Sequence, residues 1–327
     1  MEFLADIPAL LALVLGLVFL VGGGELLVRG AAALALKANI PPLIVGLTVV
    51  SMGTSAPELF ASVEAALEGH PGLAVGNVLG SNVANLALIL GLTALLRPVT
   101  VDRMALRLDI PLMLGASLLF VAVASDLEMT RSEGIGALII MGLFIGNLFW
   151  RALRQESQDA TDGDVNKGGP WAQWSPLALV GVLLAGTGGL YLGSEAFVAG
   201  ASRVALDFGV SDRIVGLTIV AFGTSVPELV ASGIAALRGQ SDLAVGNVVG
   251  SNLFNLLLVL GTTATIAPLP MEADVLSWDI WWLLGTAAAL IPLALLGGLR
   301  TPRLRRWQGG LFVLAYLVYI GTTWTGL

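Results

Sequence analysis

The chain has 327 residues, of which 56% are hydrophobic and 12% charged, and its mean hydropathy is +0.89. This composition is typical of a polytopic membrane protein and argues against a soluble enzyme. The sequence contains no cysteine, which excludes disulfides and thiolate metal sites, and its formal net charge of −7 does not suggest a nucleic-acid partner.

Ten apolar stretches, each of about 18 to 30 residues, are long enough to cross a bilayer. We expect transmembrane helices at 8–30, 41–67, 72–96, 108–125, 134–152, 174–200, 211–237, 242–267, 276–298 and 308–325. Glu2 and Asp6 flank the first stretch, where a signal peptide would carry basic residues, so we interpret it as a retained helix.

The polar segment 154–170 separates the fifth apolar stretch from the sixth. It is rich in Asp, Gln, Ser and Gly, a composition that predicts a flexible linker. We therefore expect an all-α protein with a first five-helix repeat at 1–153 and a second at 171–327, together forming one integral transport domain.

Two long stretches, at about 45–99 and 215–269, are near copies of one another. The first contains VGLTVVSMGTSAPELFASVEAAL and LAVGNVLGSNVANLALILG, and the second VGLTIVAFGTSVPELVASGIAAL and LAVGNVVGSNLFNLLLVLG. They align without a gap at an offset of about 170 residues, with roughly three positions in five identical. Because each repeat has an odd number of helices, the second copy must enter the membrane from the opposite side. The sequence thus predicts the inverted-repeat plan of secondary transporters, whose site lies at the midplane where broken helices meet.

Lysine and arginine residues in short loops indicate the orientation, since they gather on the cytoplasmic side. If the N-terminus is outside, the inner side receives Arg29, Lys37, Arg97, Arg103, Arg107, Arg151, Arg154, Lys167, Arg238, Arg300, Arg303, Arg305 and Arg306. The outer side then receives Arg131, Arg203 and Arg213. We expect a multi-pass protein of the cell (inner) membrane with both termini outside and the linker in the cytoplasm.

The motif GTSAPEL at residues 53–59 predicts a helix that breaks in the middle of an apolar stretch. Pro57 has no N–H and clashes with the carbonyl of Gly53, which itself adds backbone freedom. Gly223 and Pro227 repeat the pattern in the second copy. We expect unpaired carbonyls near 51–54, which membrane depth tolerates only when they are buried in protein or face a wet cavity. A bound cation would satisfy them.

Glu58 and Glu228 follow these prolines directly and should lie inside the membrane. An ionisable residue there costs about 2.5 to 3.5 kcal/mol even on the lenient insertion scale, so it indicates a functional site. Close helix packing would explain the small residues of the motif. It would not explain a glutamate beside a proline in both copies.

Other polar residues recur at helical spacing around the two glutamates. Thr54 and Glu58 are four residues apart, as are Ser81 and Asn85, so each pair can share a helix face. Carboxylate, hydroxyl, amide and carbonyl oxygens select Ca²⁺, Na⁺ or Mg²⁺ over Zn²⁺ or Cu²⁺. One Ca²⁺ or two Na⁺ would neutralise the two carboxylates, whereas Mg²⁺ suits a site with fewer direct protein ligands.

Several further polar residues have a structural as well as a functional interpretation. Asn82 and Asn252 suit hydrogen bonds between helices, and Asn77 and Asn247 remain ambiguous, with a structural role favoured. Glu25 precedes Arg29 by four residues, which favours a plain ion pair over a transport role. Its counterpart Glu195 has no such partner, and His70 is best explained as a solvated loop residue.

The paired motifs GTSAPEL with GNVLGSN, and GTSVPEL with GNVVGSN, resemble the two α-repeats of the cation/calcium exchanger superfamily, most closely those of prokaryotic sodium/calcium antiporters. The resemblance implies ten transmembrane helices in two inverted halves, with four core helices around a midplane site. It also implies alternating access, in which the first and sixth helices slide past the core.

The same resemblance implies that ion ligands come from both repeats. They are Glu58, Glu228, Thr54, Thr224, Ser55, Ser225, Ser81, Ser251, Asn85 and Asn255, with the backbone carbonyls of Ser51 and Ala221. Many relatives carry Asp where this chain has Asn255. The amide weakens any K⁺ requirement and leaves the Na⁺ stoichiometry open.

We therefore expect an antiporter that exchanges Ca²⁺ for Na⁺ and not an enzyme, with membrane lipid and the two ions as its partners, no protein partner and no cofactor. A H⁺/Ca²⁺ antiporter is the alternative, because glutamates also exchange protons. A Ca²⁺-permeable channel would lack a strict dependence on a counter-ion. A membrane-embedded enzyme is disfavoured because the sequence offers no nucleophile and base in a catalytic arrangement.

Overall fold

The computed structural model describes residues 7–155, 171, 173–208 and 221–325. The helices of the first half are α1 (Ala9–Lys37), α2 (Pro42–Val45), η2 (Gly46–Val50), α3 (Ser51–Thr54), α4 (Ala56–Leu67), α5 (Pro71–Val83), η3 (Ala84–Ile89), α6 (Leu90–Leu96), η4 (Ala105–Asp109), α7 (Ile110–Val123), η5 (Ala124–Asp126) and α8 (Arg131–Gln155). Those of the second half are α9 (Pro176–Asp207), α11 (Ala221–Gly223), α12 (Val226–Leu237), α13 (Ser241–Leu253), η8 (Phe254–Val259), α14 (Leu260–Ile266), η9 (Val275–Asp279), α15 (Ile280–Gly297) and α16 (Arg306–Thr325).

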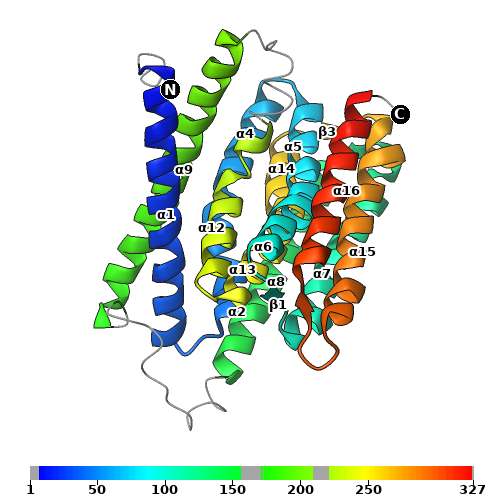
Figure 1. Cartoon of the computed structure of the whole chain (residues 1–327). Coiled ribbons are helices and arrows are strands. Elements are labelled where there is room, and N and C mark those ends of the chain that lie inside the picture. Colours follow the sequence, from blue (N-terminus) through cyan, green and yellow to red (C-terminus); the bar gives the residue numbers. More distant parts are fainter. Residues whose placement is uncertain (1–6, 156–170, 172, 209–220, 326–327) are drawn as a thin grey trace.

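The protein is a polytopic helical bundle. Within the described residues, seven helices are long and apolar enough to cross a membrane, and the bent pair Pro42–Thr54 with Ala56–Leu67 forms an eighth span. The tenth predicted stretch is α16, and the seventh corresponds to α11 and α12, with its residues 211–220 outside the described part of the chain. The start of α1 and the end of α16 lie at the same end of the bundle (Figure 1), as an even number of crossings requires.

Two helices were predicted to end too early. The helix predicted to end at residue 30 continues to Lys37, and the one predicted to end at 200 continues to Asp207. Residues 31–36 are all alanine or leucine, which are apolar and strong helix formers, so the first helix continues through them. The predicted linker begins inside α8, which ends at Gln155, and its residues 156–170 lie outside the described chain.

The two equivalent helices α1 and α9 run antiparallel, side by side at one edge of the bundle (Figure 1). Glycines at seven-residue intervals, 16, 23 and 30 on α1 and 186, 193 and 200 on α9, form the seam. A Cβ placed on Gly23 would lie 2.6 Å from the amide nitrogen of Leu190, and one on Gly193 would lie 2.6 Å from that of Leu20. Backbones in such contact leave room for glycine alone. The antiparallel course of two helices at the same repeat position demonstrates the inversion.

The core of the bundle consists of the spans 71–96 and 241–266, each formed by two α-helices with a π-helical segment between them. Their most apolar portions are 78% and 94% buried, against 28% to 39% for the other five unbroken spans. The spans with low burial therefore present their remaining surface to lipid, and the site residues on the two core spans are shielded from it.

Two short antiparallel ladders join loops of the first half to loops of the second. Strand β1 (Val99–Thr100) pairs with β4 (Arg303–Leu304), and β2 (Glu128–Met129) pairs with β3 (Leu269–Pro270). These ladders tie the two repeats together near the ends of the core spans, in addition to the contacts between their helices.

Candidate cation site

The bent span 42–67 changes direction where the proline and glycine of the motif lie. Helix α3 ends at Thr54, Ser55 forms the junction, and α4 begins at Ala56, with an angle of 44° between the two parts. In the second repeat, α11 ends at Gly223 and α12 begins at Val226. The bends place the first turns of α4 and α12, which carry Glu58 and Glu228, inside the bundle.

Backbone carbonyls at the two bends accept more hydrogen bonds than the sequence suggests. The carbonyl of Ser51 accepts a hydrogen bond from Ser55 N at 2.9 Å, and the carbonyl of Gly223 accepts one from Ser194 Oγ at 2.5 Å. The expectation of unpaired carbonyls is therefore wrong at these two positions. Ser55 N makes the ordinary i→i−4 helix bond to Ser51, and at Gly223 a hydroxyl on α9 replaces the amide donor that Pro227 lacks. The copies also differ, since Ser225 N donates to Phe222 O at 3.0 Å and not to Ala221. The carbonyl of Ser51 also lies 3.4 Å from Thr54 Oγ1, which donates to it, so both of its lone pairs have a donor nearby.

The two glutamates lie in one buried cluster, and neither has any exposed surface. Ser55 Oγ donates to Glu228 Oε1 at 3.2 Å, and Ser225 Oγ lies 3.4 Å from Glu58 Oε1. Each carboxylate is thus contacted by the serine of the other repeat, as the inverted duplication requires. Ser225 Oγ also lies 3.2 Å from Ser81 Oγ.

Threonine and serine hydroxyls extend the cluster on the side of Glu228. Ser251 Oγ lies 3.5 Å from Glu228 Oε1 and 3.5 Å from Thr54 Oγ1. The equivalent Thr224 donates to Asn77 Oδ1 at 3.4 Å. The Ser51 hydroxyl makes different contacts. It lies 2.7 Å from the carbonyl of Gly46 and 3.0 Å from the carbonyl of Asn247, and it can donate its one proton to either.

Several buried polar atoms in and next to the cluster have no hydrogen-bond partner among the described residues. They include one carboxylate oxygen of each glutamate, Oε2, and both polar atoms of the Asn85 and Asn255 amides. Buried polar atoms are almost always paired, so a set of this kind is an observation that points to a ligand. Asn85 and Asn255 lie one turn beyond Ser81 and Ser251, at the beginning of η3 and η8. Such π-helical turns are frequent at functional sites.

The chemistry of the cluster suits a hard cation. Within the described ranges, neither Glu58 nor Glu228 forms an ion pair with a Lys or Arg side chain. When both carboxylates are ionised, the site has a formal charge of −2 in a medium of low dielectric constant, which a bound cation would balance. The atoms that surround the two glutamates are carboxylate and hydroxyl oxygens, which suit a hard cation.

The two halves of the cluster differ in exposure. Thr54 and Asn247 are buried, whereas their counterparts Thr224 and Asn77 are half-buried. The cluster is therefore more accessible on the side of Thr224 and Asn77.

The sequence left the role of Asn77 and Asn247 ambiguous, with a structural role favoured, and gave no role to two serines beside them. Asn77 Nδ2 donates to Ser62 Oγ at 3.0 Å, and Asn247 Nδ2 donates to Ser232 Oγ at 2.9 Å. The serines were not singled out, although they recur at the offset of the glutamates. That recurrence is the signal that would have revealed them.

Glu25 has the expected ion pair and one further partner. It contacts Arg29 at 2.5 Å, which confirms the predicted pair, and it also binds Arg238 at the end of α12. Glu195, its counterpart, is exposed on α9. Neither residue belongs to the cluster around Glu58 and Glu228.

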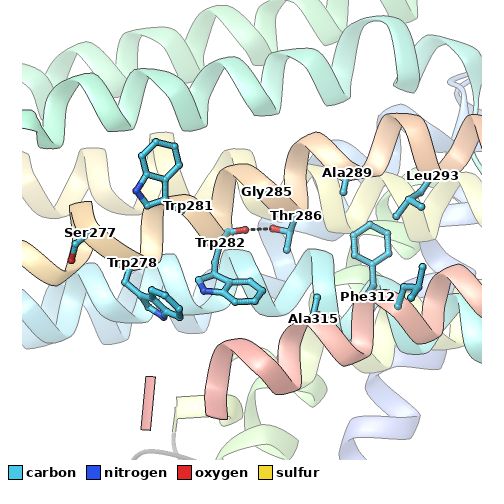
Figure 2. Close-up of a pocket in the computed structure, with 11 residues that line it drawn as sticks. Ser277, Trp278, Trp281, Trp282, Gly285, Thr286, Ala289, Leu293, Phe312 and Ala315 are labelled. Atoms are coloured by element: carbon cyan, nitrogen blue, oxygen red, sulfur yellow. Dashed lines mark hydrogen bonds between the residues drawn. The ribbon is translucent and has the colours of Figure 1, made fainter. Parts of the chain in front are cut away.

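A hollow of about 570 Å³ between α15 and α16 has no residue of the cation cluster in its walls. Figure 2 shows its tryptophans and Phe312, with Thr286 donating at 2.7 Å to the carbonyl of Trp282. Its lining is mostly apolar and aromatic, with Ser277 and Thr286 as the polar side chains and no carboxylate to balance a cation.

Comparison with known sequences identifies the family. The sequence profile described as sodium/calcium exchanger protein matches residues 8–151 and 178–325. The chain belongs to this family. It is 39% identical over 316 residues to a putative antiporter CaxA from Alkalimonas amylolytica, covering 95% of this chain and 97% of that one. It is also 39% identical over 318 residues to the inner membrane protein YrbG of Escherichia coli, covering 94% of each chain.

Two exchangers among the relatives carry more specific descriptions. The sodium/calcium exchanger MaX1 of Methanosarcina acetivorans is 29% identical over 342 residues, with 95% of this chain and 97% of that one covered. The structure of the sodium-calcium exchanger NCX_Mj superposes with a TM-score of 0.80 at 31% identity, covering 98% of this chain and 99% of that chain. CaxA is described as a putative antiporter, and MaX1 and NCX_Mj are described as sodium/calcium exchangers. This chain is a cation antiporter of the same family.

Proposed function

We propose that the protein exchanges Ca²⁺ for Na⁺ by alternating access, with both ions bound in turn at the cluster around Glu58 and Glu228. The observation that carries this proposal is the pair of buried carboxylates, one from each inverted repeat, each contacted by the other repeat's serine and each with an unpartnered oxygen. The other ligands are the hydroxyl, amide and carbonyl oxygens that the resemblance implies, and Ca²⁺ and Na⁺ are substrates, not resident cofactors.

The charge of the site supports exchange over leak. One Ca²⁺ or two Na⁺ neutralise the two carboxylates, whereas leaving both charged in a low-dielectric site is costly. The rearrangement that closes one side and opens the other should therefore be slow without bound ions. This is the property that separates an antiporter from a channel.

The unequal exposure of the two halves supports alternating access. The half of the cluster with Thr54 and Asn247 is buried, and the half with Thr224 and Asn77 is more accessible. The two inverted repeats therefore occupy different conformations in one structure. Exchanging these conformations would move the opening to the other side of the membrane. With both termini outside, the more accessible half of the cluster, with Thr224 and Asn77, faces outward.

Sodium is the proposed counter-ion, since the relatives MaX1 and NCX_Mj are sodium/calcium exchangers by name and NCX_Mj crystals were soaked with Na⁺ and Ca²⁺. A proton is the alternative, because the unpartnered carboxylate oxygens of Glu58 and Glu228 could also accept protons.

The test is uptake of radioactive Ca²⁺ into proteoliposomes under one gradient at a time. We expect uptake with Na⁺-loaded vesicles in Na⁺-free medium, and none with a pH gradient or a K⁺ gradient alone. Uptake driven by the pH gradient would replace Na⁺ by H⁺ as counter-ion. Uptake that needs no counter-ion would indicate a channel.

A further inference from the structure

Two asparagines connect the threonines of one repeat to the serines of the other repeat. Asn247 Oδ1 accepts a hydrogen bond from Thr54 Oγ1 at 3.1 Å, while its Nδ2 donates to Ser232 Oγ at 2.9 Å. Asn77 makes the equivalent contacts, accepting from Thr224 Oγ1 at 3.4 Å and donating to Ser62 Oγ at 3.0 Å. The amide of each repeat thus contacts the threonine of the opposite repeat.

The direction of these bonds matters for a cation ligand. A hydroxyl has one proton and two lone pairs, and it can coordinate a cation through a lone pair only when its proton points elsewhere. The bond from Thr54 to Asn247 Oδ1 directs the Thr54 proton toward the amide. The bond from Asn247 to Ser232 holds the amide in the orientation that presents its oxygen to Thr54.

The other contacts of the Thr54 hydroxyl are longer. It lies 3.4 Å from the carbonyl of Ser51 and 3.5 Å from Ser251 Oγ. Without the amide oxygen, the Thr54 proton could turn toward Ser251 and the interior of the cluster. A proton in that direction would repel a bound cation.

A purely structural role is less suited to these two amides than to their neighbours. Asn252, on the same helix as Asn247, donates to the carbonyl of Val248 in its own helix at 2.8 Å. Asn82 donates across the bundle to the carbonyl of Asn252 at 3.3 Å. Asn82 and Asn252 therefore bind backbone. Asn77 and Asn247 bind side chains of the site and its surroundings, and Asn77 Nδ2 also makes a longer contact of 3.5 Å with the backbone carbonyl of Glu58.

We propose that Asn77 and Asn247 are positioning residues for ion binding, each holding the threonine hydroxyl of the opposite repeat with its lone pairs toward the cation. This inference rests on the proposed function of the cluster. It adds that ligand geometry in each repeat is set by the other repeat, through an amide that does not itself touch the ion. The serines Ser62 and Ser232 act one step further out, by fixing the amides.

The test measures Na⁺-driven Ca²⁺ uptake against Ca²⁺ concentration for the intact protein and for Asn247→Ala, with Asn252→Ala as the matched control. Losing one hydrogen bond to a ligand should raise the KM for Ca²⁺ about three- to tenfold in Asn247→Ala, with the maximal rate changed by less than about twofold. Asn247→Asp keeps an acceptor for Thr54 and should restore most of the affinity. Asn252→Ala should leave the KM unchanged.

A double-mutant cycle with Thr54→Val separates positioning from general packing. If Asn247 acts through the Thr54 hydroxyl, Asn247→Ala should raise the KM little further once that hydroxyl is absent. Additive changes in the KM, an unchanged KM in Asn247→Ala, or no rescue by Asn247→Asp would overturn the inference. Failure of the intact protein to transport Ca²⁺ would instead overturn the proposed function.

Discussion

Ser55 of the first repeat donates a hydrogen bond of 3.2 Å to Glu228 of the second. Its counterpart Ser225 stands in the same relation to Glu58, at 3.4 Å. Neither carboxylate is therefore complete within its own repeat, and the site exists only where the two inverted copies meet. This arrangement explains why two copies of one motif are needed for a single cluster.

Removing either serine should weaken cation binding. A hydrogen bond to a charged group contributes about 1.5 to 3 kcal/mol, so Ser55→Ala should raise the KM for Ca²⁺ roughly tenfold or more. Ser225→Ala should act similarly, with a further contribution from its contact with Ser81. Uptake measured against Ca²⁺ concentration checks both variants. An unchanged KM in each would show that these serines do not contribute to cation binding.

The glycine seam between α1 and α9 should tolerate no side chain. A Cβ on Gly23 would lie 2.6 Å from the backbone nitrogen of Leu190, whereas one on its neighbour Gly22 would meet no atom within 4 Å. Overpacking costs about 1 to 3 kcal/mol, so Gly23→Val should lower the melting temperature in detergent and reduce transport. Gly22→Val is the matched control and should change neither property. Equal effects of the two substitutions would contradict the proposed seam.

Asp109 and Arg151 form a buried ion pair away from the cation cluster. Their atoms meet at 2.6 and 3.3 Å, and the side chain of Asp109 is fully buried while that of Arg151 is 10% exposed. Asp109→Ala leaves the arginine charge unpaired and should cost about 3 to 5 kcal/mol of stability. The double variant Asp109→Ala with Arg151→Met should recover much of that loss, because it removes both charges. Thermal unfolding in detergent measures the stability of both variants. A double variant that is no more stable than Asp109→Ala would contradict a stabilising role of the ion pair.

Periodicity and duplication predicted most of the architecture. Apolar length indicated where the helices lie, and the repeat indicated that Glu58 and Glu228 belong to equivalent helices that meet. Residue spacing alone could predict that the two glutamates meet, because each occupies the same position on its helix. Once the two equivalent helices pack together, their glutamates come together as well.

Contacts between distant elements could not be predicted in this way. The bond from Ser194 to the carbonyl of Gly223 depends on how α9 packs against α11, and position 24, its counterpart on α1, is a glycine with no hydroxyl. The partner that Arg238 supplies to Glu25 has the same origin, because it joins α1 to the end of α12. The π-helical segment that begins just before Asn85 also has no simple sequence signal.

The most direct test of the central claim is Na⁺-driven Ca²⁺ uptake by proteoliposomes containing Glu58→Gln or Glu228→Gln, compared with the unmodified protein. Each substitution keeps the shape of the side chain and removes one of the two charges that would balance Ca²⁺. We predict that either variant folds, as judged by its melting temperature, and loses Ca²⁺ uptake. Uptake at the unmodified rate in both folded variants would contradict an ion site built from this pair.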